Sequence, residues 1–240
     1  MIRAEKVSAA YGTEVIIKEL SLQIDPHQFV VVVGPNGSGK STLLKGLNGL
    51  AKVEGNLWIN GQELRDSNLM ELRREIAYVP QHWPVDPRTP LSVEDLILSG
   101  RCGKKGLLKP YSRKDHEEAR RVAQDLSIEH LFNRPVGKLS GGEFQKATIA
   151  RAIFQEPILF LLDEPTSSLD WDAGRELVDW VYQLHIEKHL TTLMVTHELN
   201  MIPPFADTIM VMRQGQIVAS GSYDEILNKE VLKNILGWEL

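Results

Sequence analysis

The residues with the clearest chemical purpose are GPNGSGKS at 34–41, which directly follow the apolar run FVVVV at 29–33. The spacing G-x-x-x-x-G-K-S between a strand and a helix is typical of a loop that binds nucleotide phosphates. Its glycines let backbone N–H groups converge on phosphate oxygens. We expect Lys40 to contact the β- and γ-phosphates and the Ser41 hydroxyl to ligate Mg²⁺. The predicted nucleotide-binding residues are Gly34, Pro35, Asn36, Gly37, Ser38, Gly39, Lys40, Ser41 and Thr42.

A second apolar run, ILFLLDEP at 158–165, ends in two carboxylates. Successive residues of a strand point to opposite sides, so Asp163 and Glu164 cannot do the same work. We expect Asp163 to hold Mg²⁺ through its water shell and Glu164 to polarise the attacking water. Beside a phosphate-binding loop, this pair predicts hydrolysis of a nucleoside triphosphate.

The segment LSGGEFQ at 139–145 opens a helix-like run and forms a second potential phosphate-binding N-terminus. A triphosphate held by one glycine-rich cradle does not need a second cradle in the same place. We therefore expect this one to serve the ATP held by another copy of the chain, through Ser140, Gly141 and Gly142.

With this segment the sequence resembles the ATP-binding subunits of ABC transporters, whose signature motif is LSGGQ. The resemblance covers the whole chain, and the remaining family motifs occur in order: Tyr11, Gln81, SSLD at 167–170 and His197. Two departures are small, since Glu143 replaces the usual glutamine and Lys146 stands where arginine is frequent. Neither removes a group that contacts phosphate.

The resemblance implies an ATPase that converts ATP and water to ADP and phosphate. Two copies would meet head to tail around two ATP molecules, each held between residues 34–42 of one copy and the signature segment and Asp170 of the other. Tyr11 would stack on adenine and His197 would contact the γ-phosphate. Gln81 would reach Mg²⁺ and sense its occupancy, while Glu164 would position the water.

The elements that must position these residues alternate between strand-like and helix-like runs at both ends of the chain, with a helical block between them. This pattern predicts an α/β fold. Together with the resemblance, it predicts a P-loop NTPase (RecA-like) core with an antiparallel β subdomain and an inserted α-helical signature subdomain. We expect one domain over residues 1–240, with a core at 1–87 and 151–240 and the helical subdomain at 88–150.

Strands are expected at 15–24, 29–34, 56–61, 76–80, 158–163 and 192–197, with a hairpin at 209–220. Helices are expected from residues 40, 92, 140 and 222 and over 114–126 and 171–184. Within them, Leu43, Leu44, Leu47 and Leu50 would share one buried helical face. Trp180 would lie on a core-facing stripe with Leu177 and Leu184, and Cys102 would lie in an exposed loop.

The composition of the chain limits the kinds of partner and the cellular location that we expect. The net charge of −5 argues against nucleic acid, because phosphate binding needs a basic face. The single Cys102 excludes an intrachain disulfide and fits a reducing cytoplasm. No signal peptide is visible, and no apolar run approaches the ~20 residues of a spanning helix. We therefore expect a cytoplasmic protein on the inner face of the plasma membrane, bound to separate permease subunits and served indirectly by an extracytoplasmic substrate-binding protein.

The proline-rich loop PQHWPVDPRTP at 80–90 follows the strand that leads to Gln81. In the resembling family, the cleft beside this loop receives a short helix of the membrane subunit. We expect the permease to dock near residues 81–90, with His82, Trp83 and Val85 forming an apolar docking surface. The alternative is that Trp83 packs into the core of its own chain.

The transported substrate is less well marked. Residues 85–115 resemble the equivalent segment of zinc, manganese and iron import ATPases, which favours uptake of a divalent metal ion. PTSSLD and HELN are closer to siderophore and cobalamin importers. A siderophore or cobalamin-type importer and a soluble single-cassette ABC ATPase therefore remain as alternatives. LSGGEFQ disfavours a P-loop kinase or GTPase outside the family. His185 and His189 have the spacing of a zinc-binding pair, but Glu187 is not in the H-E-x-x-H position and a helix C-terminus favours histidine anyway, so a zinc site is disfavoured.

Overall fold

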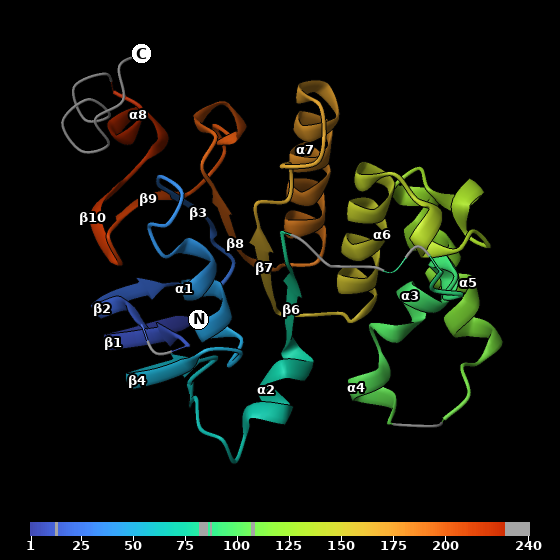
Figure 1. Ribbon diagram of the computed structural model, residues 1–240, viewed down its shortest axis with the longest axis horizontal. Coiled ribbons are helices and arrows are strands. Elements are labelled where there is room, and N and C mark those ends of the chain that lie inside the picture. The colour runs from blue at the N-terminus through green and yellow to red at the C-terminus, as the bar shows by residue number, and fades with distance from the viewer. Residues whose placement is uncertain (13, 82–85, 87, 107–108, 229–240) are drawn as a thin grey trace.

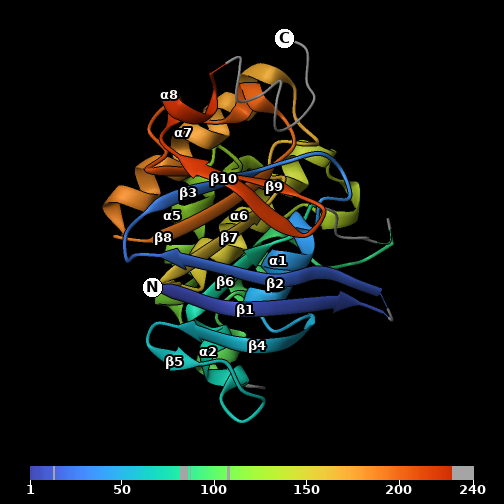
Figure 2. The same cartoon turned by 90° about the vertical axis from the view of Figure 1, so that its left-hand side faces the viewer.

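The computed structural model describes residues 1–12, 14–81, 86, 88–106 and 109–228. Two sheets and two groups of helices make up the described part of the chain (Figure 1). The first sheet, of order β2-β1-β4-β5, is antiparallel and lies on the outside of the molecule (Figure 2). Its strands are β1 (Ile2–Tyr11), β2 (Glu14–Ile24), β4 (Lys52–Ile59) and β5 (Gln62–Glu63).

The second sheet, of order β10-β9-β3-β8-β7-β6, lies in the middle of the molecule. All of its neighbouring strands pair in parallel except the C-terminal hairpin β9–β10. Its strands are β3 (Phe29–Val33), β6 (Ile76–Val79), β7 (Leu159–Asp163), β8 (Thr191–Thr196), β9 (Thr208–Arg213) and β10 (Gln216–Gly221). Every residue of β3, β7 and β8 is buried, as is usual for parallel strands covered on both faces.

Two apolar cores cover the two faces of this sheet. Val30 and Val32 of β3 point into a core shared with α1 (Lys40–Leu47) and the antiparallel sheet. Val31 and Val33 point into the other core, which is shared with α6 (Gly141–Phe154) and α7 (Trp171–Glu187). The alternation of strand side chains thus separates α1 from α6, a separation that decides how the site is built.

The remaining helices gather beside α6, apart from α2 (Leu69–Glu75) and α8 (Tyr223–Ile226). They are α3 (Val93–Ser99), α4 (Cys102–Lys105), α5 (Arg113–Asp125) and the short 3-10 turns Glu129–Leu131 and Val136–Lys138, with a third turn at Leu199–Met201 following β8. Capping boxes begin α3, α5 and α6 through Ser92, Ser112 and Ser140. Each satisfies backbone N–H groups that a helix start leaves unpaired.

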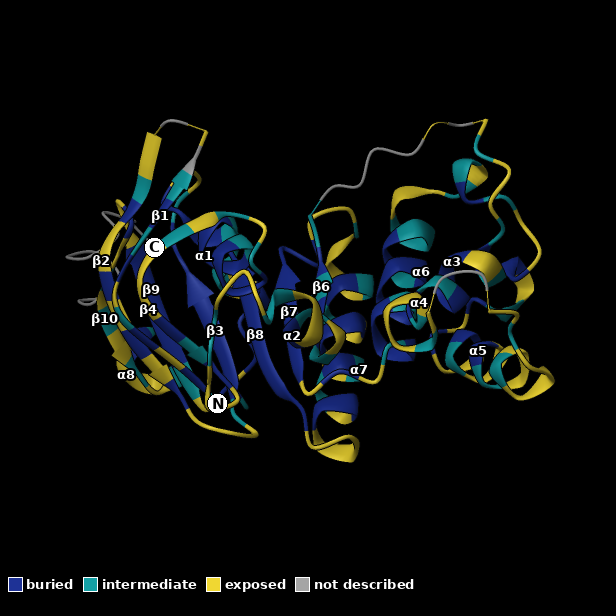
Figure 3. Cartoon of the chain, turned by 90° about the horizontal axis from the view of Figure 1, so that it is seen from below, coloured by how far each residue is buried: buried dark blue, intermediate teal, exposed yellow. Residues whose placement is uncertain are grey.

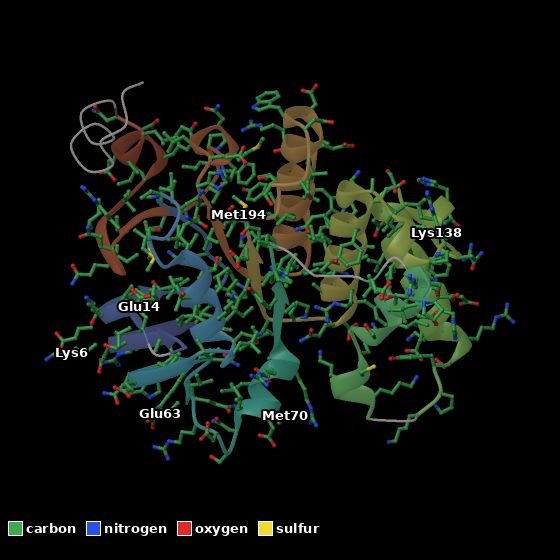
Figure 4. The ribbon with its side chains drawn as sticks, viewed as in Figure 1. Lys6, Glu14, Glu63, Met70, Lys138 and Met194 are labelled. Atoms are coloured by element: carbon green, nitrogen blue, oxygen red, sulfur yellow. The ribbon has the colours of Figure 1, made fainter. Side chains whose placement is uncertain are left out.

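Burial is greatest in the central sheet and on the helix faces that pack against it (Figure 3). Met194 of β8 lies in the interior, whereas Lys6, Glu14 and Glu63 project from the outer sheet and the exposed Met70 from α2 (Figure 4). Among the described residues, no helix is long and apolar enough to cross a membrane.

The predicted fold class is confirmed, with an α/β core, an antiparallel sheet and a set of inserted helices. Some details were predicted wrongly. Strand β1 was not expected. Leu50 is 55% exposed because α1 ends at Leu47 and Gly49, at φ 63°, turns the chain away. Cys102 is exposed, as predicted, but begins α4 instead of lying in a loop. The prediction for Trp180 is confirmed, since this half-buried side chain packs against the core that contains Leu177 and Leu184.

The division at residues 88 and 150 stays a prediction. Residue 150 falls inside α6, which runs without a break to Phe154.

Candidate active site

The loop between β3 and α1 needs its glycines for steric reasons. A Cβ on Gly34 would lie 2.1 Å from the carbonyl oxygen of Met212 on β9, closer than any side chain allows. Gly37 and Gly39 have φ angles of 77° and 106°, in the region that favours glycine. The first expected cradle therefore exists as a tight backbone turn at the carboxyl end of β3.

The start of α1 leaves hydrogen-bond donors available to a ligand. No side chain caps the helix at Gly39, and its first turn contains no acidic residue. Ser38 is buried, and its hydroxyl has no partner among the residues that the structure describes. Backbone N–H groups and positive dipole at a helix N-terminus suit phosphate oxygens.

Lys40 brings a buried cation to this turn. Its Nζ donates to the carbonyl oxygens of Gly34 at 2.9 Å and Pro35 at 3.1 Å, and lies 3.6 Å from Oε1 of Glu164. Burial lowers the pKa of Lys40, against the opposing charges of Glu164 and Asp163. The two carboxylates at the end of β7 therefore help to keep this ammonium charged.

Asp163 is held between two hydroxyls. Ser41 Oγ donates to its Oδ1 at 2.9 Å, and the Tyr78 hydroxyl donates to its Oδ2 at 3.0 Å. Burial raises the pKa of Asp163, while the hydrogen bonds from Ser41 and Tyr78 act in the opposite direction. Hard oxygen donors of this kind are those that Mg²⁺ takes from proteins, so Ser41 and Asp163 fit the expected metal.

Glu164 is the meeting point of three strand ends. Its Oε2 accepts from Gln81 Nε2 at 2.7 Å and lies 2.9 Å from Nδ1 of His197. Gln81 comes just after β6, Glu164 after β7 and His197 after β8. Carboxyl ends of neighbouring parallel strands share one edge of a sheet, which is where ligands of such folds bind.

The backbone of Glu164 is unusual. Its φ of 46° lies in the left-handed region, and its N–H donates to the carbonyl oxygen of Val195 at 3.0 Å. Conformations of this kind cost energy in residues other than glycine and cluster at functional sites. Here the turn aims the carboxylate at Gln81, Lys40 and His197.

The signature segment lies on the other side of the central sheet. Ser140 caps α6, and Asp170 caps α7 by accepting from the Ala173 N–H at 2.9 Å. Gly141 and Gly142 lie against the SSLD segment, so the two motifs form one surface. Because α1 and α6 pack on opposite faces of the sheet, one chain does not bring this surface to its own phosphate loop (Figure 1).

The structure thus brings together residues 34–42, Gln81, Asp163, Glu164 and His197, and leaves Ser140, Gly141, Gly142 and Asp170 apart from them. Tyr11 ends β1, and its side chain is outside the described residues. His82, Trp83 and Val85 also lie outside them.

Sequence reasoning missed Tyr78, whose hydroxyl contacts Asp163. The available signal was its place in the apolar run IAYVP, directly before Gln81.

Comparison with known proteins agrees with this geometry. The ABC transporter family model matches residues 17–167, more than half of the chain. The ferric enterobactin transport ATP-binding protein FepC of Escherichia coli is 33% identical, with 98% of this chain and 87% of the relative covered. The manganese transport ATP-binding protein MntB of Bacillus subtilis is 32% identical, with 100% of this chain and 93% of the relative covered. The phosphonates import ATP-binding protein PhnC of Wolinella succinogenes is 35% identical, with 100% of this chain and 89% of the relative covered.

Solved structures give the same result. The dimeric structure of the bacterial ABC transporter cassette MJ0796 matches with a TM-score of 0.81 and 28% identity, covering 93% of this chain and 99% of the cassette. A structure of the same cassette, equally similar, is a dimer with ADP and phosphate bound after hydrolysis. This chain therefore belongs to the ABC transporter ATP-binding family, and it is an ATP-binding, ATP-hydrolysing subunit of the importer type.

Proposed function

We propose that the chain hydrolyses ATP between two of its own copies and thereby energises uptake of a metal-containing substrate through a separate permease. The observation that carries the catalytic part is the convergence of Gln81, Lys40 and His197 on the carboxylate of Glu164. A carboxylate fixed by three partners at the edge of a phosphate loop is placed to orient a water molecule.

In this proposal the chain's own groups act chiefly by positioning and by charge. The loop at 34–42 and the α1 N-terminus bind the phosphates, and Lys40 stabilises the charge that develops on them. Glu164 accepts a hydrogen bond from the attacking water, and His197 donates to the γ-phosphate. Tyr11 stacks on adenine.

Mg²⁺ would be held by Ser41, Asp163 and Gln81, and when bound it supplies charge neutralisation at the phosphates. The support is the pair formed by Ser41 Oγ and Asp163 Oδ1 at the loop. Gln81 contacts Glu164 in this structure, so its approach to Mg²⁺ requires that contact to exchange.

The second copy supplies Ser140, Gly141, Gly142 and Asp170. Support comes from their place on the face of the sheet opposite α1 and from the dimeric cassette to which the chain is similar. Permease subunits would dock near residues 81–90, which places the protein on the cytoplasmic face of the membrane.

The test of the catalytic assignment is Glu164→Gln. The amide oxygen of glutamine can still accept from Gln81, but the amide carries no charge for Lys40 and cannot accept a proton from water. We expect ATP to remain bound, a stable dimer on gel filtration with ATP, and hydrolysis reduced at least ~100-fold. Glu198→Gln, one residue beyond His197, is the matched control and should hydrolyse ATP normally. Wild-type turnover in Glu164→Gln would disprove the assignment.

Two substrate classes are supported by separate observations. The similarity to FepC and the motifs PTSSLD and HELN favour an iron–siderophore. The segment at 85–115 and the similarity to MntB favour a free divalent metal ion. Vesicles that contain the chain with its permease and binding protein would decide, because ATP hydrolysis should be stimulated by ferric siderophore in the first case and by Mn²⁺ or Zn²⁺ in the second. Stimulation by a phosphonate alone would contradict both.

A further inference from the structure

Tyr78 has no role in the function proposed so far, yet its hydroxyl lies at the centre of the site. It stands on β6 and is paired in register with Leu161 of the neighbouring strand β7. Its side chain reaches past this pair to Asp163, where its hydroxyl donates to Oδ2 at 3.0 Å. We propose that Tyr78 is a positioning residue of the magnesium site, which holds the Asp163 carboxylate in the orientation that binds the metal.

The two oxygens of Asp163 have different partners. Ser41 on α1 donates to Oδ1 at 2.9 Å, and Tyr78 on β6 donates to Oδ2. A carboxylate held at only one oxygen can rotate about its Cβ–Cγ bond, whereas donors from two separate elements fix its plane. Oδ1 then stays directed at Ser41, which is the second expected ligand of the metal.

The phenol contacts an oxygen that is shielded from bulk water. Asp163 is only 2% exposed, and among the described residues Tyr78 is the one hydrogen-bond donor to Oδ2. Without the hydroxyl, a buried carboxylate oxygen would lose its partner, and the carboxylate would turn to recover one. Groups that orient a metal ligand typically change metal affinity by about 10–100-fold when they are removed.

The backbone of Tyr78 gives the positioning residue a fixed base. Its carbonyl oxygen accepts from Arg151 of α6 at 3.3 Å, and its strand pairs with β7, which carries Asp163 itself. Tyr78 and Asp163 therefore lie on adjacent strands of one sheet. The pairing of the two strands fixes the spacing between Tyr78 and Asp163.

The inference rests on the proposed magnesium site, and its test separates the two. The affinity of a fluorescent ATP analogue is measured in EDTA and then as a function of Mg²⁺ concentration, for the wild type and Tyr78→Phe. We expect Tyr78→Phe to bind the analogue in EDTA within about 2-fold of wild type. The Mg²⁺ concentration that gives half of the maximal increase in affinity for the analogue should rise about 10-fold in Tyr78→Phe.

Tyr111→Phe is the matched control. It makes the same change at a hydroxyl that contacts Cys102 Sγ at 3.0 Å, among the inserted helices. It should leave both affinities unchanged. Asp163→Asn supplies the second comparison, because adding Tyr78→Phe to it should cause no further loss of Mg²⁺ dependence if the phenol acts through that carboxylate.

Each outcome has one meaning. If the wild type shows no Mg²⁺ dependence, the magnesium site itself is disproved, and the role of Tyr78 with it. If the wild type shows it and Tyr78→Phe matches the wild type, the inference about Tyr78 alone is overturned. An equal loss of affinity in EDTA and in Mg²⁺ also overturns it, because the hydroxyl would then stabilise the fold and not the metal ligand.

Discussion

Two helices of this chain begin with glycine-rich turns, yet their N-termini are built differently. α1 begins at Gly39 with no side-chain cap and no acid in its first turn. α6 begins at Ser140, whose hydroxyl accepts from the Glu143 N–H while the Glu143 carboxylate accepts from the Ser140 N–H. The first helix start is left open, and the second is partly closed by its own side chains.

The difference supports the proposal that one chain carries two phosphate-facing turns without binding two nucleotides. Among the described residues no side chain caps the start of α1, so its backbone N–H groups gain most from a bound anion. A self-capped start has less to gain, which agrees with the proposal that it contributes only where another copy brings the phosphate to it. We therefore expect substitutions at α1 to act on binding by the monomer and substitutions at α6 to act on the dimer.

The largest effect is expected for Lys40→Ala, which removes the buried cation from the open helix start. Affinity of the monomer for ATP should fall about 100-fold, equivalent to ~2.7 kcal/mol, as measured by titration calorimetry. Hydrolysis should be lost as well. Lys52→Ala, at an exposed lysine of β4, is the control and should bind normally. Normal ATP affinity in Lys40→Ala would contradict the contrast between the two helices.

An intermediate effect is expected for Gly142→Ala in α6. The new methyl group would lie 2.6 Å from Cδ2 of Leu169, on the surface that we propose faces the second copy. ATP affinity of the monomer should stay within about 2-fold, while ATP-dependent dimerisation and hydrolysis fall about 10-fold. Light scattering and phosphate release measure the two. Gly103→Ala, with ordinary room beside Arg74, controls for the substitution itself. Weaker binding by the monomer would show that α6 serves the site of its own chain.

The smallest effect concerns the closed start of α6 and its dependence on pH. The backbone N–H of Ser140 holds the pKa of Glu143 below its ordinary value. Because its pKa is lowered, Glu143 stabilises the fold when the pH is above the ordinary pKa of glutamate. This stability is lost as the pH falls through the lowered pKa. The melting temperature of Glu143→Gln should therefore lie about 1 °C below wild type at pH 7 and approach it in acid. A difference that grows in acid would reverse the sign and exclude the capping carboxylate as its cause.

Sequence alone was enough for the motifs whose chemistry is set by local spacing. The phosphate loop, the acid pair and the start of α6 are each contained in a few consecutive residues. The contacts that the sequence did not predict depend on pairing between segments that are distant in the chain. The Tyr78–Asp163 contact exists because β6 lies beside β7, and no local pattern of IAYVP indicates which strand becomes its neighbour.

Other misses come from single backbone angles. Leu50 continues the apolar spacing of α1, but the positive φ of Gly49 ends the helix before it. The left-handed turn of Glu164 is likewise invisible in the sequence, because glutamate has no preference for it. It is set by its surroundings, including the hydrogen bond to Val195.

The place of β3 in the central sheet has a consequence for how the protein is made. The strand that leads to the phosphate loop has β8 and β9 as its neighbours, and Phe29 is opposite Thr192 in the register. On a ribosome the phosphate loop would be synthesised early. Strand β3 could pair with β8 and β9 only after most of the chain had been made. Pairings this distant in sequence form slowly, and an apolar strand without a partner is prone to aggregate. A nascent chain stalled before residue 190 would therefore carry every residue of the phosphate loop but neither of the strands that pair with β3.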